Sequence, residues 1–97
     1  MPIGDVRSDL VSVAADGYLD IRPPPTEEWV IINIFHEYDV DLAWVDSTRE
    51  LVFDTDVGRG LYAAFTFHVR NGLWLRVKNK DTANARLVGY SGVVTKG

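Results

Sequence analysis

Two Asp-x-Asp pairs, Asp39 with Asp41 and Asp54 with Asp56, have a spacing that could carry chemistry. On a strand this spacing places both carboxylates on one face, and in a loop both can reach one hard cation such as calcium. Neither pair has the spacing of an EF-hand, and aspartate is frequent at strand ends because it hydrogen-bonds its own backbone. The sequence therefore favours turn or solvation roles over a calcium site, and we expect no bound metal.

The two histidines, His36 and His68, each lie inside or at the end of a strand-like segment. Either could act as a base, a ligand or a pH-sensitive interface group. A catalytic triad has no support, because the chain has no cysteine and no serine in a nucleophile-elbow setting. The chain has fourteen acidic residues, so a pair with the spacing of a glycosidase site is expected by chance and is not evidence for that activity. The glycines around Arg59 lack the strand–loop–helix context of a phosphate-binding loop. The sequence predicts no catalytic residue, no cofactor and no enzyme.

The three tryptophans raise the hypothesis of a sugar-binding platform. Trp29 lies in a strongly apolar segment and Trp44 alternates with apolar neighbours, so we expect both in the core. Trp74 differs, because alternation places it on the outer face of its strand among cationic groups. Tryptophan and arginine dominate interface hot spots. We therefore predict a protein interface, with a Trp74 that is isolated or covered by its own loop as the alternative. The predicted interface consists of Trp74, Arg76, His68, Tyr62 and Arg70.

Length and composition limit the elements that must position these residues. The 97 residues allow a single domain, 1–97. The absence of cysteine excludes a disulfide framework and Cys-ligated zinc. A net charge of −4 argues against binding to nucleic acid or to an anionic membrane, which requires a basic face. No apolar run approaches the ~18 residues of a membrane span, and the first ten residues lack the apolar region of a secretory signal.

Turn signals recur about every 8–12 residues, which is typical of an all-β sandwich or barrel. The segments between them are rich in β-branched and aromatic residues, which suit a pleated, half-buried surface. We predict an all-β fold of about eight short antiparallel strands in a two-sheet, jelly-roll-like sandwich, with residues 1–9 as an extended N-terminal arm. The predicted strands are 10–14, 18–22, 28–36, 40–45, 49–54, 61–70, 73–79 and 86–94.

The segments 61–70 and 73–79 alternate most cleanly between apolar and polar residues. Alternation places Leu61 inward and Tyr62 outward. A two-residue loop between the two segments would set apolar residues opposite charged ones, which the period of two forbids. A three-residue loop over 70–72, with a G1 bulge at Gly72, removes this conflict. The predicted pairs are Val69–Leu73, Phe67–Leu75 and Phe65–Val77, and a structure that pairs Arg70 with Leu73 contradicts them.

The segment 29–35 is apolar on both faces, which is typical of a central strand that is covered on both sides. A two-layer sandwich covers only one side of each sheet. A loop, the N-terminal segment or another subunit must then cover the second face.

Four stretches carry a resemblance that extends over most of the chain from residue 18 onward. They are YLDIRPP at 18–24, EEWVIINI at 27–34, LRVKN at 75–79 and GYSGVVTK at 89–96. They resemble small β-sandwich virion proteins of tailed bacteriophages, of the capsid decoration or cement type. The resemblance implies a non-enzymatic protein that is made in the host bacterial cytoplasm and stabilises the capsid surface by bridging major capsid protein subunits. It also implies a homo-oligomer, with a trimer expected.

Other functions stay open at this point. A head–tail adaptor or a fibre-tip module of a phage has the same general look. A carbohydrate-binding β-sandwich module is a further alternative, and it needs two or three coplanar exposed aromatics from Trp74, Tyr62 and Tyr90.

Overall fold

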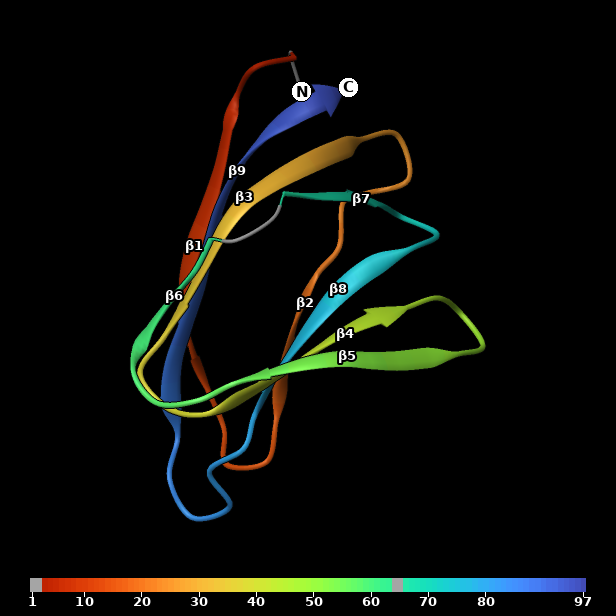
Figure 1. Ribbon diagram of the computed structural model, residues 1–97. Coiled ribbons are helices and arrows are strands. Elements are labelled where there is room, and N and C mark those ends of the chain that lie inside the picture. Colours follow the sequence, from red (N-terminus) through yellow and green to blue (C-terminus); the bar gives the residue numbers. More distant parts are fainter. Residues whose placement is uncertain (1–2, 64–65) are drawn as a thin grey trace.

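The structure of the chain is a computed structural model that describes residues 3–63 and 66–97. Two antiparallel β-sheets pack face to face, so the predicted all-β sandwich is confirmed (Figure 1). The described residues form the strands β1 Val6–Val13, β2 Tyr18–Ile21, β3 Glu28–His36, β4 Val40–Val45, β5 Glu50–Asp56, β6 Gly60–Tyr62, β7 Phe67–Arg70, β8 Trp74–Asn79 and β9 Arg86–Lys96.

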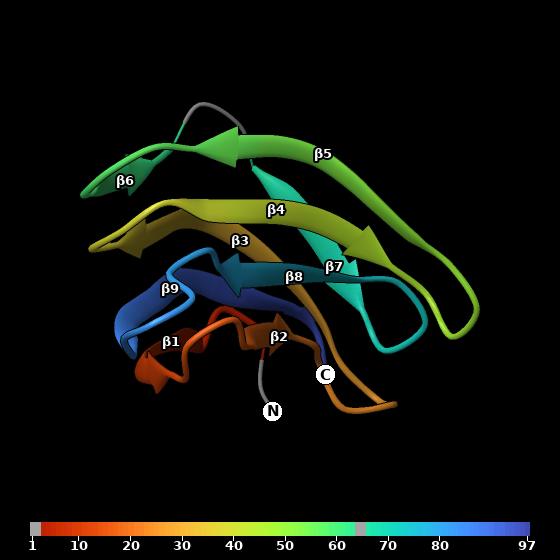
Figure 2. The same cartoon turned by 90° about the horizontal axis from the view of Figure 1, so that it is seen from below.

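The order of the strands is that of a jelly roll. Sheet A has the order β1-β9-β3-β6, with β7 also paired to β3, and sheet B has the order β2-β8-β4-β5. Figure 1 shows the two sheets as separate layers, and in Figure 2 strands of the two sheets overlap, β4 with β3 and β8 with β9. The sixth position of the jelly roll, which the sequence predicts as one strand over 61–70, is divided between β6 and β7.

The core between the sheets follows from the alternation of apolar residues along the strands. Ile31 and Ile34 of β3 are fully buried from one side, and Leu75 and Val77 of β8 are fully buried from the other. Aromatic side chains fill the space where the sheets diverge, and Phe67 lies at the centre of this group. The other residues of the core are Val13, Ile21, Trp29, Val40, Leu42, Val69, Val88 and Val94, with Trp44, Phe53, Tyr62 and Tyr90 packed against them.

The predicted register between 61–70 and 73–79 is wrong. Arg70 pairs with Leu73 in an isolated bridge, with backbone N···O distances of 2.9 and 3.2 Å. The conflict of faces does not arise, because β7 and β8 separate after this single rung. β7 joins β3 in sheet A, and β8 joins β2 and β4 in sheet B. The predicted partner Phe65 lies outside the described residues.

The first strand begins earlier than the sequence predicts. β1 starts at Val6, so residues 6–9 belong to the edge of sheet A and pair with β9 instead of forming an arm. This strand was predicted only over 10–14. Just before β1, the backbone N–H of Gly4 donates to the carbonyl of Val94, which lies near the end of β9, at 2.8 Å. The two ends of the chain therefore lie next to each other (Figure 1).

Candidate protein-interaction surface

The outer face of sheet A, which points away from the core, carries a row of apolar side chains. Backbone pairing places Leu10 of β1 beside Gly89 of β9. Phe35 of β3 lies between Gly89 and Leu61 of β6. A Cβ at position 89 would overlap the Phe35 ring, so the ring occupies the space that the glycine leaves free. The row therefore crosses four strands, with an aromatic ring over a glycine near its centre.

We define the outer apolar patch as Leu10, Phe35, Leu61 and Leu87. These residues line a shallow hollow of about 540 Å³, together with His36, Glu37, Arg59 and Gly60. Leu10 is 59% exposed, Leu61 60% and Leu87 43%. Single exposed leucines are normal, but contiguous exposed apolar residues mark contact surfaces.

The apolar character of sheet A continues beyond this patch. Val6 and Ile32 are also exposed, and Ile32 lies at a bulge of β3 between two inward residues, Ile31 and Ile34. The segment 29–35 lies in the central strand β3 and is apolar on both faces, as predicted, but the predicted cover of the second face is not seen among the described residues. No described element covers the outer face, because the N-terminal segment joins the edge of the sheet as β1 (Figure 1).

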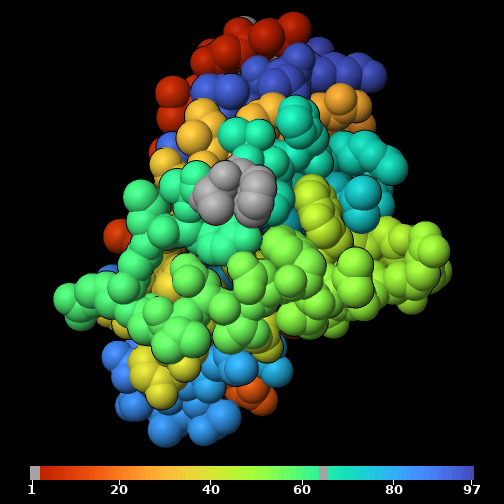
Figure 3. Space-filling model, viewed as in Figure 1, coloured from red at the N-terminus to blue at the C-terminus, as the bar shows by residue number. Residues whose placement is uncertain are grey.

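One cation and one anion lie at the rim of the hollow. Glu37 uses one carboxylate oxygen, Oε1, to accept the backbone N–H of Leu87 at 2.8 Å. The Arg59 side chain is exposed and makes no hydrogen bond or ion pair with the part of the chain that the structure describes. The segment between β5 and β6, which carries Arg59, projects from the body of the molecule (Figure 3). Arg59 is therefore available to a neighbouring molecule, whereas Glu37 also interacts electrostatically with Arg86 of its own chain.

His36 also lines this hollow, and its side chain links strand β3 of sheet A to strand β5 of sheet B. Its side chain is fully buried, and its Nε2 lies 2.7 Å from Oδ2 of Asp56 at the end of β5. Its Nδ1 lies 2.9 Å from the carbonyl oxygen of Tyr38. Both ring nitrogens therefore face oxygen acceptors. The role visible in the structure is a link between β3 and β5.

Trp74 lies on the outer face of sheet B, as predicted, but its own chain covers it. It is 5% exposed and packs with Ala43 and Val45 in a small second cluster. The guanidinium of Arg22, which directly follows β2, lies 3.8 Å from the Trp74 ring centroid. The expectation that Trp74 forms an open contact surface is wrong, because the alternative weighed from the sequence, coverage by the same chain, is realised.

Arg76 takes part in a charge network on the same face. Its guanidinium donates to both carboxylate oxygens of Asp20, at 2.8 and 3.2 Å, and lies 3.7 Å from Glu50. It also lies 3.9 Å from the ring centroid of Tyr18. The hydrogen bonds to Asp20 raise the pKa of Arg76, so it remains a cation. This residue is committed to contacts within sheet B.

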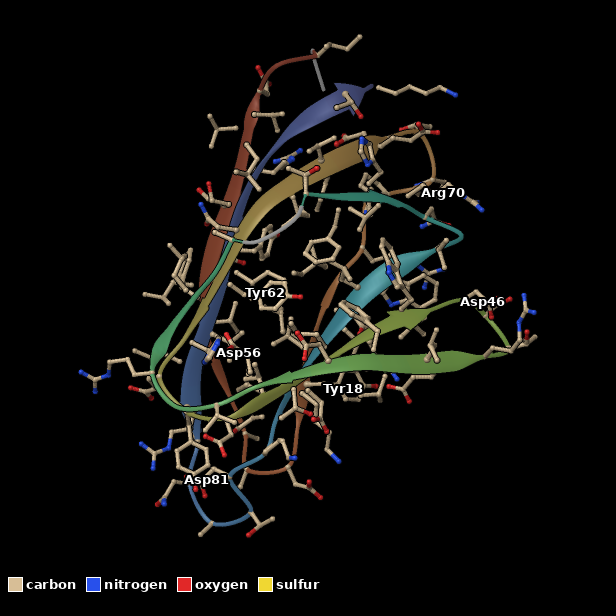
Figure 4. The ribbon with its side chains drawn as sticks, in the orientation of Figure 1. Tyr18, Asp46, Asp56, Tyr62, Arg70 and Asp81 are labelled. Atoms are coloured by element: carbon tan, nitrogen blue, oxygen red, sulfur yellow. The ribbon has the colours of Figure 1, made fainter. Side chains whose placement is uncertain are left out.

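The other three predicted interface residues separate into two places. His68 and Arg70 are exposed on β7, beside Val30 and Glu28 on the outer face of sheet A. Tyr62 points into the space between the sheets, whereas Arg70 points away from the body (Figure 4). The Tyr62 ring centroid lies 6.0 Å from that of Phe67, and burial raises the pKa of Tyr62. The five predicted residues therefore do not form one surface.

Leu61 of the outer apolar patch was predicted on the wrong side because the division between β6 and β7 reverses the alternation. One continuous strand over 61–70 puts Leu61 on the same face as Phe67. In the structure Leu61 points outward and Tyr62 inward, the opposite of the prediction. The one sequence signal for the patch was the second apolar face of 29–35.

The Asp-x-Asp pairs are engaged in hydrogen bonds within the chain, two of them to residues distant in sequence and one to the adjacent residue. Asp39 accepts the backbone N–H of Gly58 at 2.7 Å, and Asp41 accepts the Thr55 hydroxyl at 2.6 Å. Asp54 accepts the backbone N–H of Thr55 at 2.8 Å. Within residues 3–63 and 66–97 no three His, Asp or Glu side chains gather in a way that could hold a metal ion.

The three aromatic residues proposed as a sugar platform do not form one within the part of the chain that the structure describes. Trp29 is buried and stacks with the half-buried Tyr90 at a centroid distance of 6.4 Å. Tyr62 faces the core and Trp74 lies under Arg22. The coplanar exposed set that the carbohydrate-binding alternative requires, Trp74 with Tyr62 and Tyr90, is therefore not present.

No family model matches this chain, and no curated protein matches it either. The described part of the chain contains no helix of the length and apolarity that a membrane crossing needs.

Proposed function

We propose that this chain is a non-enzymatic structural protein of a tailed-phage virion, a capsid decoration protein whose assembly uses the outer apolar patch. The observation that carries this proposal is the exposure of Leu10, Leu61 and Leu87 on one continuous sheet face. Water contact with such a face is unfavourable, and burial against another protein removes it.

The location in a virion is supported by the resemblance of the stretches at 18–24, 27–34, 75–79 and 89–96. The fold adds an analogy, because jelly rolls are frequent in viral capsid proteins, although they also occur in lectins and cupins. The function would be mechanical. Added contacts between neighbouring shell subunits raise the free energy needed to separate them, and no bond is made or broken.

Electron microscopy of virions that carry this chain tests the proposal. We expect density of the size and shape of this sandwich at many equivalent positions over the shell. A few copies at the tail vertex would contradict decoration and favour the head–tail adaptor, and copies at a fibre end would favour the fibre-tip module.

A pair of matched variants tests the contribution of the patch. Leu61→Glu places a charge on the outer apolar patch, whereas Leu51→Glu places it on a leucine of β5 in sheet B that is similarly exposed, 64% against 60%. Shells lacking the chain are incubated with each variant, and the bound protein is counted. We expect Leu61→Glu to lower occupancy and Leu51→Glu to match the wild type. Equal occupancy for both variants would remove the patch from the proposal.

A further inference from the structure

We infer that the outer apolar patch binds a second copy of this chain, with sheet A packed on sheet A about a twofold axis along the seam between β3 and β6. The inference rests on the proposed function insofar as both use the patch as a contact surface. It adds the partner and the symmetry, which the proposed function leaves open.

The register of β3 and β6 carries the argument. Phe35 pairs with Leu61, and His36 pairs with Gly60, so Glu37 and Arg59 are the next residues on opposite sides of the same seam. A twofold axis along the seam exchanges the two strands between copies. Each Leu61 then lies on the Phe35 of the other copy, and each Arg59 faces the Glu37 of the other copy. A twofold contact requires this reciprocity, in which residue i meets j and j meets i.

The chemistry on the two sides of the seam is complementary. The exposed Leu61 lies on one side of the seam, and the Phe35 ring, packed over Gly89, lies on the other. Both line a hollow of about 540 Å³. Arg59, which makes no hydrogen bond or ion pair with the described residues, lies across from Glu37, whose carboxylate accepts the Leu87 N–H and interacts electrostatically with Arg86. Apolar and charged groups of one copy thus both find their counterparts on a second copy.

The apolar surface of sheet A extends beyond the two strands that meet at the seam. Five aliphatic side chains of the outer face, Val6, Leu10, Ile32, Leu61 and Leu87, are between 43% and 69% exposed. A twofold axis along the seam covers Phe35 and Leu61, whereas Val6, Leu10 and Leu87, on β1 and β9, extend beyond the edge of the second copy. The contact is therefore smaller than a standard interface of about 800 Å² per partner, and the expected association is weak. Sheet faces pack about 10 Å apart, which suits side chains of this length.

The first experiment is sedimentation equilibrium of the full chain from micromolar to millimolar concentration. We expect a monomer–dimer equilibrium, an at least tenfold weaker association for Leu61→Glu, and no change for the matched control Leu51→Glu. A monomer at all concentrations overturns the inference. A trimer also overturns it, and supports the threefold ring that the resemblance implies.

The second experiment exchanges the charges. Arg59→Glu alone should weaken the dimer, because it sets two carboxylates opposite each other at both symmetric positions. Adding Glu37→Lys should restore association toward the wild-type constant, and Arg70→Glu serves as the control at an exposed arginine away from the seam. An unchanged constant in Arg59→Glu, or no rescue in the double variant, contradicts the twofold pairing.

The two proposals can fail separately. A dimer that obeys the charge exchange but is absent from the shell refutes decoration and leaves the twofold contact intact. A chain that occupies the shell in many copies but stays monomeric in solution refutes the twofold contact and leaves decoration intact.

Discussion

Arg22 covers Trp74: the guanidinium carbon lies 3.8 Å from the ring centroid, and the guanidinium Nε donates to the backbone carbonyl of Asn71 at 2.8 Å. A residue beyond the end of β2 thereby closes the outer face of β8. The pair converts a tryptophan that alternation places outside the core into a buried one.

Trp74→Ala should destabilise the monomer rather than weaken assembly. Removal of a buried tryptophan side chain costs about 3–5 kcal/mol through lost burial and the cavity left behind. Trp74→Phe should cost much less, because the indole Nε1–H is buried without a hydrogen-bond partner among the described residues. Urea denaturation of both variants measures the difference. A fully stable Trp74→Ala would show that this cluster contributes nothing to the fold.

Arg22→Ala should expose the Trp74 ring without unfolding the chain. A cation over an aromatic ring at a partly exposed site contributes about 0.5–1 kcal/mol. We therefore expect a small loss of stability and greater accessibility of tryptophan fluorescence to a collisional quencher. Arg70→Ala is the matched control, since Arg70 is exposed and its side chain makes no ring contact within residues 3–63 and 66–97. Identical quenching in the two variants would mean that Arg22 does not shield the ring.

Gly89→Ala should be strongly unfavourable. A Cβ at position 89 meets the Phe35 ring on one side and lies 2.5 Å from the backbone carbonyl oxygen of Asp9, which cannot move without disturbing the β1–β9 pairing. Overpacking of this kind typically costs about 1–3 kcal/mol. Gly60→Ala is the control, because a Cβ there has no atom within 4 Å. The midpoint of thermal unfolding should be lower for Gly89→Ala than for Gly60→Ala, and equal midpoints would contradict the close approach of Phe35.

Stability should fall in acid because of Asp81. Its carboxylate accepts the backbone N–H of Ala83 at 2.9 Å and pairs with the guanidinium of Arg86 at 2.8 Å. These contacts lower the pKa of Asp81 from 3.8 to about 2. The unfolded chain therefore takes up this proton first, so the contribution is complete above pH 3.8 and is lost as the pH falls toward 2.

Urea titrations between neutral pH and pH 2 measure this effect. Asp81→Asn should flatten the acid limb of the stability profile, and Asp9→Asn is the control at an exposed aspartate whose carboxylate accepts the adjacent Leu10 N–H. Asp81→Asn should retain some acid sensitivity from Asp46, since hydrogen bonds from Thr48 and Arg49 also lower the pKa of Asp46 to about 2. A wild-type profile that does not change between neutral pH and pH 2 would contradict the role of Asp81.

Much of the fold could be predicted from the sequence, because alternation along a strand reports which side faces the core. The inward positions Leu75 and Val77 and the two apolar faces of β3 were identified in this way. Alternation carries no information about which sheet a strand joins. The register predicted at Arg70 and Leu73 was therefore wrong, because two strands joined by a turn do not always stay paired beyond it.

The interaction surface was harder to predict than the fold. Burial of Trp74 depends on Arg22, which is 52 positions away in sequence (74 − 22) and reaches it only through the pairing of β2 with β8. Exposure of Leu61 depends on where the strand ends, because the division into β6 and β7 exchanges its inward and outward sides. Both are tertiary effects that local periodicity cannot encode.

The alternation of the chain between the two sheets has a kinetic consequence. Most connections lead from sheet A to sheet B or back, so neither sheet is made of one contiguous stretch of sequence. The pairing of β1 with β9 requires that the two ends of the chain meet. Chains dominated by such distant pairings fold in about milliseconds to seconds, because the entropy of closing long loops is lost before the stabilising contacts form. We therefore expect slow, all-or-none folding in which neither sheet exists without the other.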